Sequence, residues 1–237
     1  MPGDFKQGHV VALDRDQAAY LGKVLRLKTG AQIGLFNETV GEWHAALHWQ
    51  GKRDVVATIA AQVCVAEPDI GPTLAFAPLK KTPLEWLVVK ATELGVGALQ
   101  PVISDYTQGE LTRVERLTLL LTEATEQSER CRVPRLLPPQ KLLPWLDQAG
   151  QVVVAAEAGQ VRDAKDWVAT GKKPQALLVG PEGGFSPAEL ERFAQMPRLT
   201  CLNLGPRILR AETAALSLLT LTQFAHGDFI DRPAFRS

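Results

Sequence analysis

The sequence predicts an α/β protein with a mainly parallel sheet, preceded by a small β-barrel. From residue 73 onward, short apolar runs alternate with stretches that have apolar residues at helical spacing, which is typical of strand–helix units. Residues 1–70 instead contain short apolar segments separated by turn residues, which favours strands. Between these parts, the prolines and glycine of 67–72 predict a linker. We therefore expect two domains, at 1–70 and 73–237.

In the first domain we expect a short helix over 20–27, followed by three strands. The strands are predicted over 32–36, 42–49 and 54–65, where β-branched, aromatic and small apolar residues lie between glycine-containing turns. These elements together predict the small barrel.

In the second domain the apolar runs predict strands over 74–77, 98–103, 152–156, 176–179 and 199–204. Helices are predicted over 84–94, 113–130 and 211–225. A further helix should start at Ser186, because Ser186, Pro187 and Glu189 form the pattern of a capping box with proline in the first turn.

The bulk composition is that of an ordinary globular protein. The chain has 237 residues, 46% of them hydrophobic and 22% charged, and a net charge of zero, so no overall field attracts nucleic acid or an anionic membrane. Its three cysteines are scattered and form no C-x-x-C motif, which favours a reducing cytosol. No apolar run approaches the length of a membrane span. We expect a soluble cytoplasmic protein with no membrane partner, and the four scattered histidines predict no metal site.

Two glycine-rich turns are the most informative feature of the chain. One follows the predicted strand 176–179 and begins at Gly180; the other follows the strand 199–204. Gly183 and Gly184 permit positive φ angles and a close approach of backbone to a ligand, and ligands of α/β sheets bind at the carboxyl ends of strands. Neither turn has a P-loop or dinucleotide-binding pattern, so a phosphate-rich cofactor is disfavoured. The two turns could also be plain strand–helix connections; together they predict one crevice lined by backbone amides.

These turns carry a specific resemblance. V-G-P-E-G-G-F-S-x-x-E-L at 179–190 and L-G-x-R-I-L-R-x-E-T-A at 204–214 are similar to the signature of the bacterial RsmE-type 16S ribosomal RNA uridine-N3 methyltransferases, of the SPOUT superfamily. Three further segments resemble that family in the same order: 23–30, K-A-T-E-L-G-V at 90–96, and E-A-x-E-Q-S-x-R-x-x-V-P at 123–134. The stretch 103–107 departs from the family pattern, because it lacks the arginine usual after Pro101.

The resemblance implies a PUA-like barrel and a C-terminal trefoil knot that binds S-adenosylmethionine, in a homodimer that acts on 16S ribosomal RNA or the small ribosomal subunit. Carried over by position, the cofactor-binding residues would be Glu157, Val179, Gly180, Pro181, Glu182, Gly183, Gly184, Leu204, Gly205, Ile208, Leu209, Arg210, Thr213 and Ala214.

Methylation of uracil N3 requires removal of its proton. Glu212 or Glu182 could accept that proton, and Arg210 could stabilise charge on the uracil oxygens. In the plainer alternative, Glu212 is a first-turn helix residue favoured by the helix dipole, and Arg210 is its salt-bridge partner.

Two basic clusters are candidates for phosphate contacts, although such clusters are also common on solvated faces. Lys23, Arg26 and Lys28 crowd one turn of the first domain, and Arg130 and Arg132 belong to a stretch that has no acidic residue between 130 and 141. Two other functions stay open at this point. The chain could be a knotted methyltransferase for another RNA position, or a catalytically silent RNA-binding or ribosome-assembly protein.

Overall fold

The computed structural model describes residues 5–37, 40–51, 53–65, 71–109, 114–156, 161–169 and 172–229. Backbone contacts divide the chain into two compact units. The first comprises Met1–Asp69 and Glu129–Arg132, and the second comprises Ile70–Ser128 and Val133–Ser237. The segment Glu129–Arg132 therefore packs with the first unit, although the sequence on both sides of it belongs to the second. Most of the predicted linker lies outside the described residues.

The first unit contains an antiparallel sheet whose strands occur in the order β1-β4-β3-β2. The strands are β1 (Val10–Ala12), β2 (Gln32–Asn37), β3 (Gly41–Trp49) and β4 (Val55–Cys64). The three longer strands confirm the sequence prediction, and the sequence did not reveal β1. The predicted helix is displaced: α1 (Arg15–Ala19) begins earlier, at an Asp14 capping box, and continues as the π-helical η1 (Tyr20–Val24). Leu47, Ala57 and Ile59 form the centre of the core.

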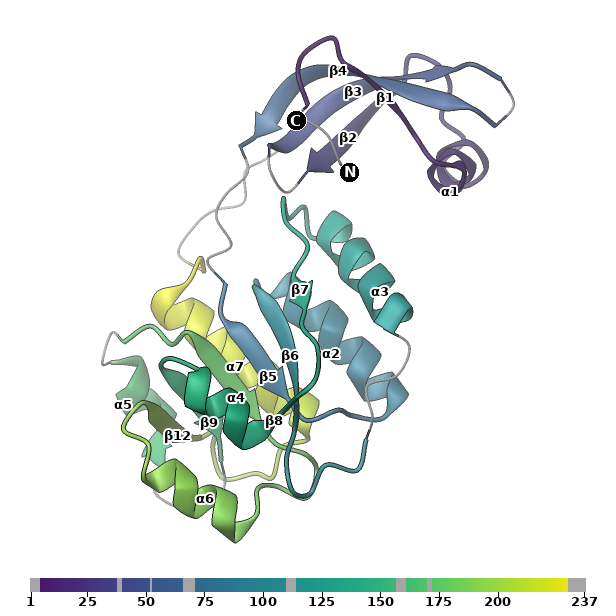
Figure 1. The fold of residues 1–237 in the computed structure, drawn as a ribbon. Helices are drawn as coiled ribbons and strands as arrows, with labels where there is room; N and C mark the ends of the chain where they lie inside the picture. Colours follow the sequence, from purple (N-terminus) through teal and green to yellow (C-terminus); the bar gives the residue numbers. More distant parts are fainter. Residues whose placement is uncertain are drawn as a thin grey trace. The chain divides into compact units, whose positions relative to one another are not determined.

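The second unit is built on an eight-stranded parallel sheet, which confirms the predicted α/β class (Figure 1). Its strand order is β10-β12-β9-β11-β5-β6-β7, and β8 pairs with the end of β6. The strands are β5 (Thr73–Phe76), β6 (Ala98–Ile103), β7 (Arg135–Leu136), β8 (Gln140–Lys141), β9 (Val152–Ala155), β10 (Arg162–Asp163), β11 (Ala176–Val179) and β12 (Leu199–Asn203). The five predicted strands of this domain are confirmed to within one residue at each end, and the two-residue strands were not predicted.

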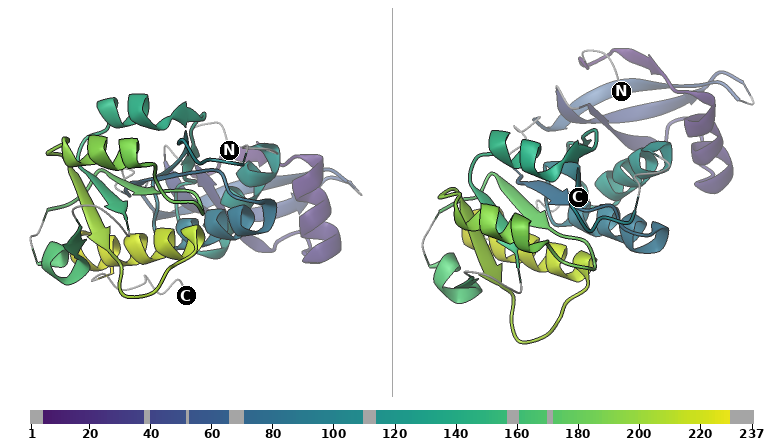
Figure 2. Two further views of the ribbon diagram at one scale, coloured as in Figure 1. Left: turned by 90° about the horizontal axis from the view of Figure 1, so that it is seen from below. Right: turned by 60° about the horizontal axis from the view of Figure 1, so that its bottom comes forward.

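Helices cover both faces of this sheet, as the views in Figure 2 show. They are α2 (Lys81–Glu93), α3 (Val114–Gln127), α4 (Leu142–Gln148), α5 (Ala164–Val168), α6 (Pro187–Ala194) and α7 (Ala211–His226). Side chains of α2, α3, α5 and α7 pack on one face, and those of α4 and α6 pack on the other. Because strand side chains alternate between faces, Leu177 and Val179 join the first core and Leu178 joins the second. Each central strand is thus apolar on both sides.

Local signals place the helix ends that matter for the site. Ser186 caps α6: its hydroxyl accepts a hydrogen bond from the backbone N–H of Glu189, and the Glu189 side chain accepts one from the backbone of Ser186, as the sequence predicts. Gly95 follows α2 with a φ of 78°, in the left-handed conformation expected of a helix-ending glycine.

Within the described ranges, no helix has both the length and the apolar character needed to cross a membrane.

The end of α7 makes the stability of the second unit depend on pH. The His226 ring packs edge-on against Trp167, with ring centroids 5.3 Å apart, and its Nε2 atom is buried without a hydrogen-bond partner among the described residues. Burial, and then the charge of Lys173, lower the pKa of His226 from its ordinary value of 6.5. The unfolded chain therefore binds this proton more readily than the folded chain does.

We expect the free energy of unfolding to be largest above the unfolded pKa of His226 and to fall as the pH drops through 6.5 toward the lower folded value. A His226→Gln variant should lose this part of the pH dependence. Chemical denaturation of both proteins between about pH 8 and about pH 5 measures the difference. Parallel pH profiles for the two proteins would contradict the expectation.

Candidate functional site

The two predicted glycine turns lie at the carboxyl edge of the parallel sheet, but their strands are not neighbours. Strand β9 pairs with β11 on one side and with β12 on the other. The turn after Val179 and the turn after Asn203 are therefore separated by the end of β9, at Ala155 and Ala156. The strands β11 and β12 are consecutive in sequence, as predicted, and β9 lies between them in the sheet.

In the first turn, each glycine has a different role. An added Cβ at Gly180 would come 2.9 Å from the tip of the Phe185 ring, so a larger residue there would force the ring to move. Gly184 has a φ of 72°, which a residue with a side chain rarely adopts. Gly183 does not have a positive φ; a Cβ there would lie 3.5 Å from the Cβ of Tyr106. Only one of the two predicted left-handed glycines therefore needs that conformation.

A buried carboxylate joins this turn to the loop after β6. The Glu189 side chain is 3% exposed. Its Oε2 accepts a hydrogen bond from the backbone N–H of Ser186 at 2.8 Å, and its Oε1 accepts one from the backbone N–H of Asp105 at 3.0 Å. The Ser186 hydroxyl donates to the Asp105 carboxylate at 2.5 Å. Two loops far apart in sequence are thereby held together.

A pocket of about 310 Å³ lies where these two loops meet. It is lined by Glu182 and Gly183 from the turn after β11 and by residues 105–108 from the loop after β6. Sequence reasoning noticed 103–107 only as a departure from a family pattern. The position of this segment at the end of a parallel strand was the signal that could have placed it at the site, because such strand ends share one edge of the sheet.

The second turn starts with Gly205, whose φ of 111° favours glycine. Its backbone N–H donates a hydrogen bond to the Asn203 side chain at 2.9 Å. Ile208 is 87% exposed, and Arg210 is the residue that precedes α7, with no side-chain capping bond of its own. Glu212 lies in the first turn of α7. Although both residues are described, no ion pair links Arg210 and Glu212, so the predicted salt-bridge alternative is not found.

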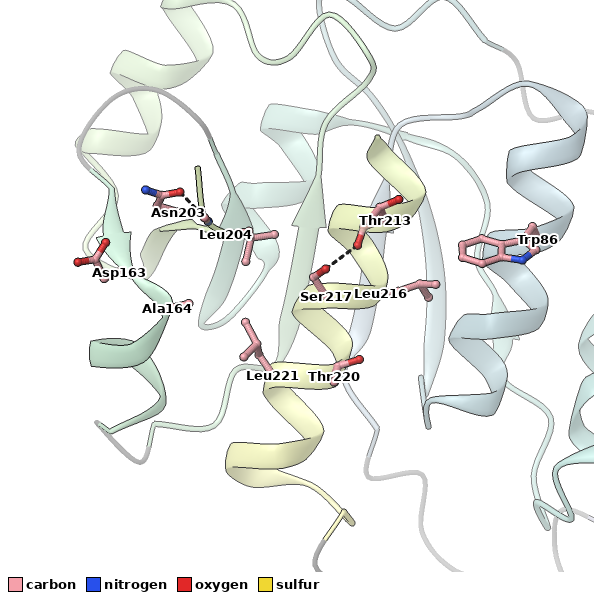
Figure 3. A pocket seen from close by; sticks show the side chains of 11 residues that line it. Trp86, Asp163, Ala164, Asn203, Leu204, Thr213, Leu216, Ser217, Thr220 and Leu221 are labelled. Carbon is pink, nitrogen blue, oxygen red and sulfur yellow. Dashed lines mark hydrogen bonds between the residues drawn. The ribbon is translucent and has the colours of Figure 1, made fainter. Parts of the chain in front are cut away.

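A larger pocket of about 660 Å³ lies beside this turn (Figure 3). It is lined by Asn203–Gly205, by the α7 face from Thr213 to Leu221, by Asp163 and Ala164, and by Trp86 of α2. In Figure 3, Leu204, Leu216 and Leu221 supply apolar surface, and Thr213, Ser217 and Thr220 supply hydroxyl groups from α7. Its volume is within the range of small-molecule sites.

The predicted cofactor residues therefore do not all line one pocket. Leu204, Gly205 and Thr213 line the larger pocket, and Glu182 and Gly183 line the smaller one. Three others, Val179, Gly180 and Ala214, are buried, so they can offer a ligand mainly backbone atoms. Pro181 and Leu209 are half-buried, and Ile208 and Arg210 are exposed. Glu157 lies outside the described residues.

The five predicted RNA-contacting residues all fall in the first unit. Lys23, Arg26 and Lys28 are exposed around the end of η1, whereas Arg130 and Arg132 are half-buried. Arg26 has a φ of 55°, an uncommon conformation for a residue with a side chain.

The described residues were also compared with the requirements of a metal site and of a reactive Cys201 thiol. These residues contain no group of three histidine, cysteine or acidic side chains that could hold a metal ion. Burial raises the pKa of the Cys201 thiol, which disfavours the reactive thiolate.

Comparisons with known proteins find an RNA methyltransferase family model for each of the two parts of the chain. Residues 67–223 match the family model of the RNA methyltransferase domain, and residues 13–59 match that of the RNA methyltransferase PUA domain. The ribosomal RNA small subunit methyltransferase E of Rickettsia conorii is 32% identical over 203 residues, which cover 84% of this chain and 83% of that protein. Its counterpart from Bacillus subtilis is 37% identical over 164 residues, 61% of this chain and 64% of the relative.

A solved structure extends the likeness to the whole fold. The ribosomal RNA small subunit methyltransferase E of Neisseria gonorrhoeae, bound to S-adenosyl methionine, superposes with a TM-score of 0.82 at 27% identity and covers 97% of each chain. The expected PUA-like N-terminal domain and methyltransferase domain are both present as family matches. By these matches, the chain belongs to the RNA methyltransferase family that includes the ribosomal RNA small subunit methyltransferases E.

Proposed function

We propose that this protein transfers a methyl group from S-adenosylmethionine to N3 of a uridine in 16S ribosomal RNA. The observation that carries the proposal is the likeness over 97% of the chain to a relative bound to S-adenosyl methionine. Both glycine turns follow strands of the parallel sheet, Gly184 and Gly205 have positive φ angles, and Gly180 lies against the Phe185 ring. The protein is an S-adenosylmethionine-dependent ribosomal RNA methyltransferase.

The residues of the site suit this cofactor. The larger pocket is lined by apolar side chains and by hydroxyl and amide groups, which fits a ligand that has an adenine ring and polar ends. Neither turn carries the lysine or the glycine spacing of a phosphate-binding loop, in keeping with a cofactor without phosphates. We assign the backbone of Gly180–Gly184 and of Leu204–Ala214 to holding it, together with Glu157, which follows β9 in the sequence.

The remaining family features belong to the same proposal. We infer that the second unit forms a trefoil knot, that the sheet of the first unit closes as a PUA-like barrel, and that the protein works in the cytoplasm. We also infer a homodimer. An exposed apolar side chain supports it: Phe224 on α7 is 65% exposed.

The chemistry assigns distinct tasks to the residues of this chain. S-adenosylmethionine supplies an electrophilic methyl group when it is bound. Uracil N3 is a poor nucleophile until its proton is removed, and Glu182 or Glu212 accepts that proton. Arg210, exposed at the start of α7, stabilises the negative charge that then spreads over the uracil oxygens. The base must leave its stack to present N3, and a single-stranded site lowers that cost.

The function is tested in a strain that lacks the protein. We expect 3-methyluridine to disappear from 16S ribosomal RNA, as measured by mass spectrometry of nucleosides, and to return when the gene is restored. Persistence of 3-methyluridine would contradict the target. Loss of another methylated nucleoside would instead indicate a different RNA position. Titration calorimetry with S-adenosylmethionine separates a third case, because a catalytically silent RNA-binding protein would bind none.

The proton acceptor is tested with two isosteric variants, Glu182→Gln and Glu212→Gln. We expect one of them to lower kcat by about 10²- to 10⁴-fold, which is the usual contribution of a general base, while the affinity for S-adenosylmethionine is kept. The other variant should retain most of kcat. If both variants kept the wild-type kcat, neither carboxylate would be the base.

Arg210→Ala should lower kcat as well, because the charge on the uracil oxygens would lose its stabilising partner. Full activity in this variant would show that Arg210 does not stabilise that charge.

The basic cluster Lys23, Arg26 and Lys28 is tested through the salt dependence of RNA binding. The double variant Lys23→Ala/Lys28→Ala should reduce the slope of log affinity against log salt concentration by about 1.4, if each lysine neutralises one phosphate of single-stranded RNA. Lys165→Ala, an exposed lysine of the second unit, is the matched control and should leave the slope unchanged. An unaltered slope in the double variant would show that these lysines do not contact phosphates.

A further inference from the structure

The smaller pocket is a rigid and chemically specific feature that the family comparisons do not assign. Its floor is the turn 104–107, in which the backbone N–H of Ser104 donates to the Thr107 hydroxyl at 2.9 Å and the backbone N–H of Thr107 donates to the Ser104 carbonyl at 3.1 Å. Asp105 is bound to Ser186 and Glu189. The loop is therefore held in place before any ligand arrives, which lowers the entropy cost of binding.

Three side chains or groups at this pocket are left available. Tyr106 is 46% exposed and lies next to Gly183, where an added Cβ would come 3.5 Å from the Tyr106 Cβ and 3.8 Å from its ring. Gln108 and Glu182 are exposed and make no hydrogen bond or ion pair with the described residues. The pocket thus offers an aromatic surface, an amide that can donate and accept, and a carboxylate that accepts.

The charge of the pocket determines which part of an RNA it can take. Asp105 and Glu182 are both acidic, and no basic side chain lines the pocket, so a phosphate group would be repelled. A carboxylate instead favours a group that carries an N–H. RNA-binding proteins recognise unstacked bases through aromatic stacking and through hydrogen bonds to the pairing edge. The pocket therefore suits a base and not the backbone.

We propose that this pocket holds the target uracil, with Tyr106 stacking on the ring, Gln108 donating to a uracil carbonyl oxygen, and Glu182 accepting from N3–H. This inference rests on the proposed function and makes it more specific. Uracil presents an N–H between two carbonyl acceptors, whereas cytosine has an acceptor at N3 that would face the Glu182 carboxylate. The pocket therefore selects uracil against cytosine, and it places Glu182 at the proton that must leave.

The experiment measures kcat and KM for ribosomal RNA, and separately the affinity for S-adenosylmethionine, in Tyr106→Ala, Tyr106→Phe and Gln108→Ala. Tyr106→Ala should raise KM for the RNA about 5- to 150-fold, as expected for loss of one stacked base, and Tyr106→Phe should restore it because the ring remains. Gln108→Ala should raise KM for the uridine substrate and weaken the preference for uridine over a cytidine at the target position. Affinity for S-adenosylmethionine should stay unchanged in all three.

The matched controls are Leu119→Ala, which removes an apolar side chain that is 49% exposed, and Gln127→Ala, which removes an exposed amide; both lie on α3. Neither should alter KM. The wild type could methylate ribosomal RNA while both Tyr106→Ala and Gln108→Ala keep its KM and its preference for uridine. In that case the assignment of the smaller pocket to the target uracil is wrong, and the proposed function stands. A Tyr106→Phe variant as impaired as Tyr106→Ala would also overturn the stacking role. If the wild type methylates no ribosomal RNA, the function fails, and the pocket assignment fails with it.

Discussion

The architecture of the site depends on one buried carboxylate. Glu189 is almost fully enclosed, and a charge in that position is costly unless its oxygens are hydrogen-bonded. Each oxygen accepts a backbone N–H, one from Ser186 in its own capping box and one from Asp105 in a loop that is distant in sequence. The same side chain therefore starts a helix and fastens the loop after β6 to the glycine turn after β11. Together with the hydrogen bond from the Ser186 hydroxyl to the Asp105 carboxylate, it holds the two sides of the smaller pocket in one arrangement.

Features formed by residues close together in the sequence could be predicted from it, and features formed by distant segments could not. The Ser186 capping box could be read correctly because all of its partners lie within three residues. The long strands could be read because β-branched and apolar residues cluster within them. The strands β7, β8 and β10 have two residues each and carry no pattern of their own, so they exist only through pairing with longer neighbours. The strand order also depends on contacts between distant segments.

The same reasoning explains the candidate site. Gly184 and Gly205 stood out because glycine marks backbone conformations that other residues avoid, and both have positive φ angles; Gly180 instead lies against the Phe185 ring. Tyr106 and Gln108 did not stand out, because their one signal in the sequence is their position just after a strand of the parallel sheet, which names no particular residue. Their neighbour Asp105 is 84 residues from Glu189, and only the fold brings the two loops together. The PUA match and the methyltransferase match gave the domain identities, which periodicity alone could not supply.

The position of β9 places a third strand end between the two glycine turns. Neighbouring strands are about 4.8 Å apart, so the ends of β11 and β12, with β9 between them, are separated by roughly 10 Å at the sheet edge. A ligand that contacts the last residues of both strands therefore crosses the end of β9, near Ala155 and Ala156. A nucleoside joined to an amino-acid chain is long enough to do so.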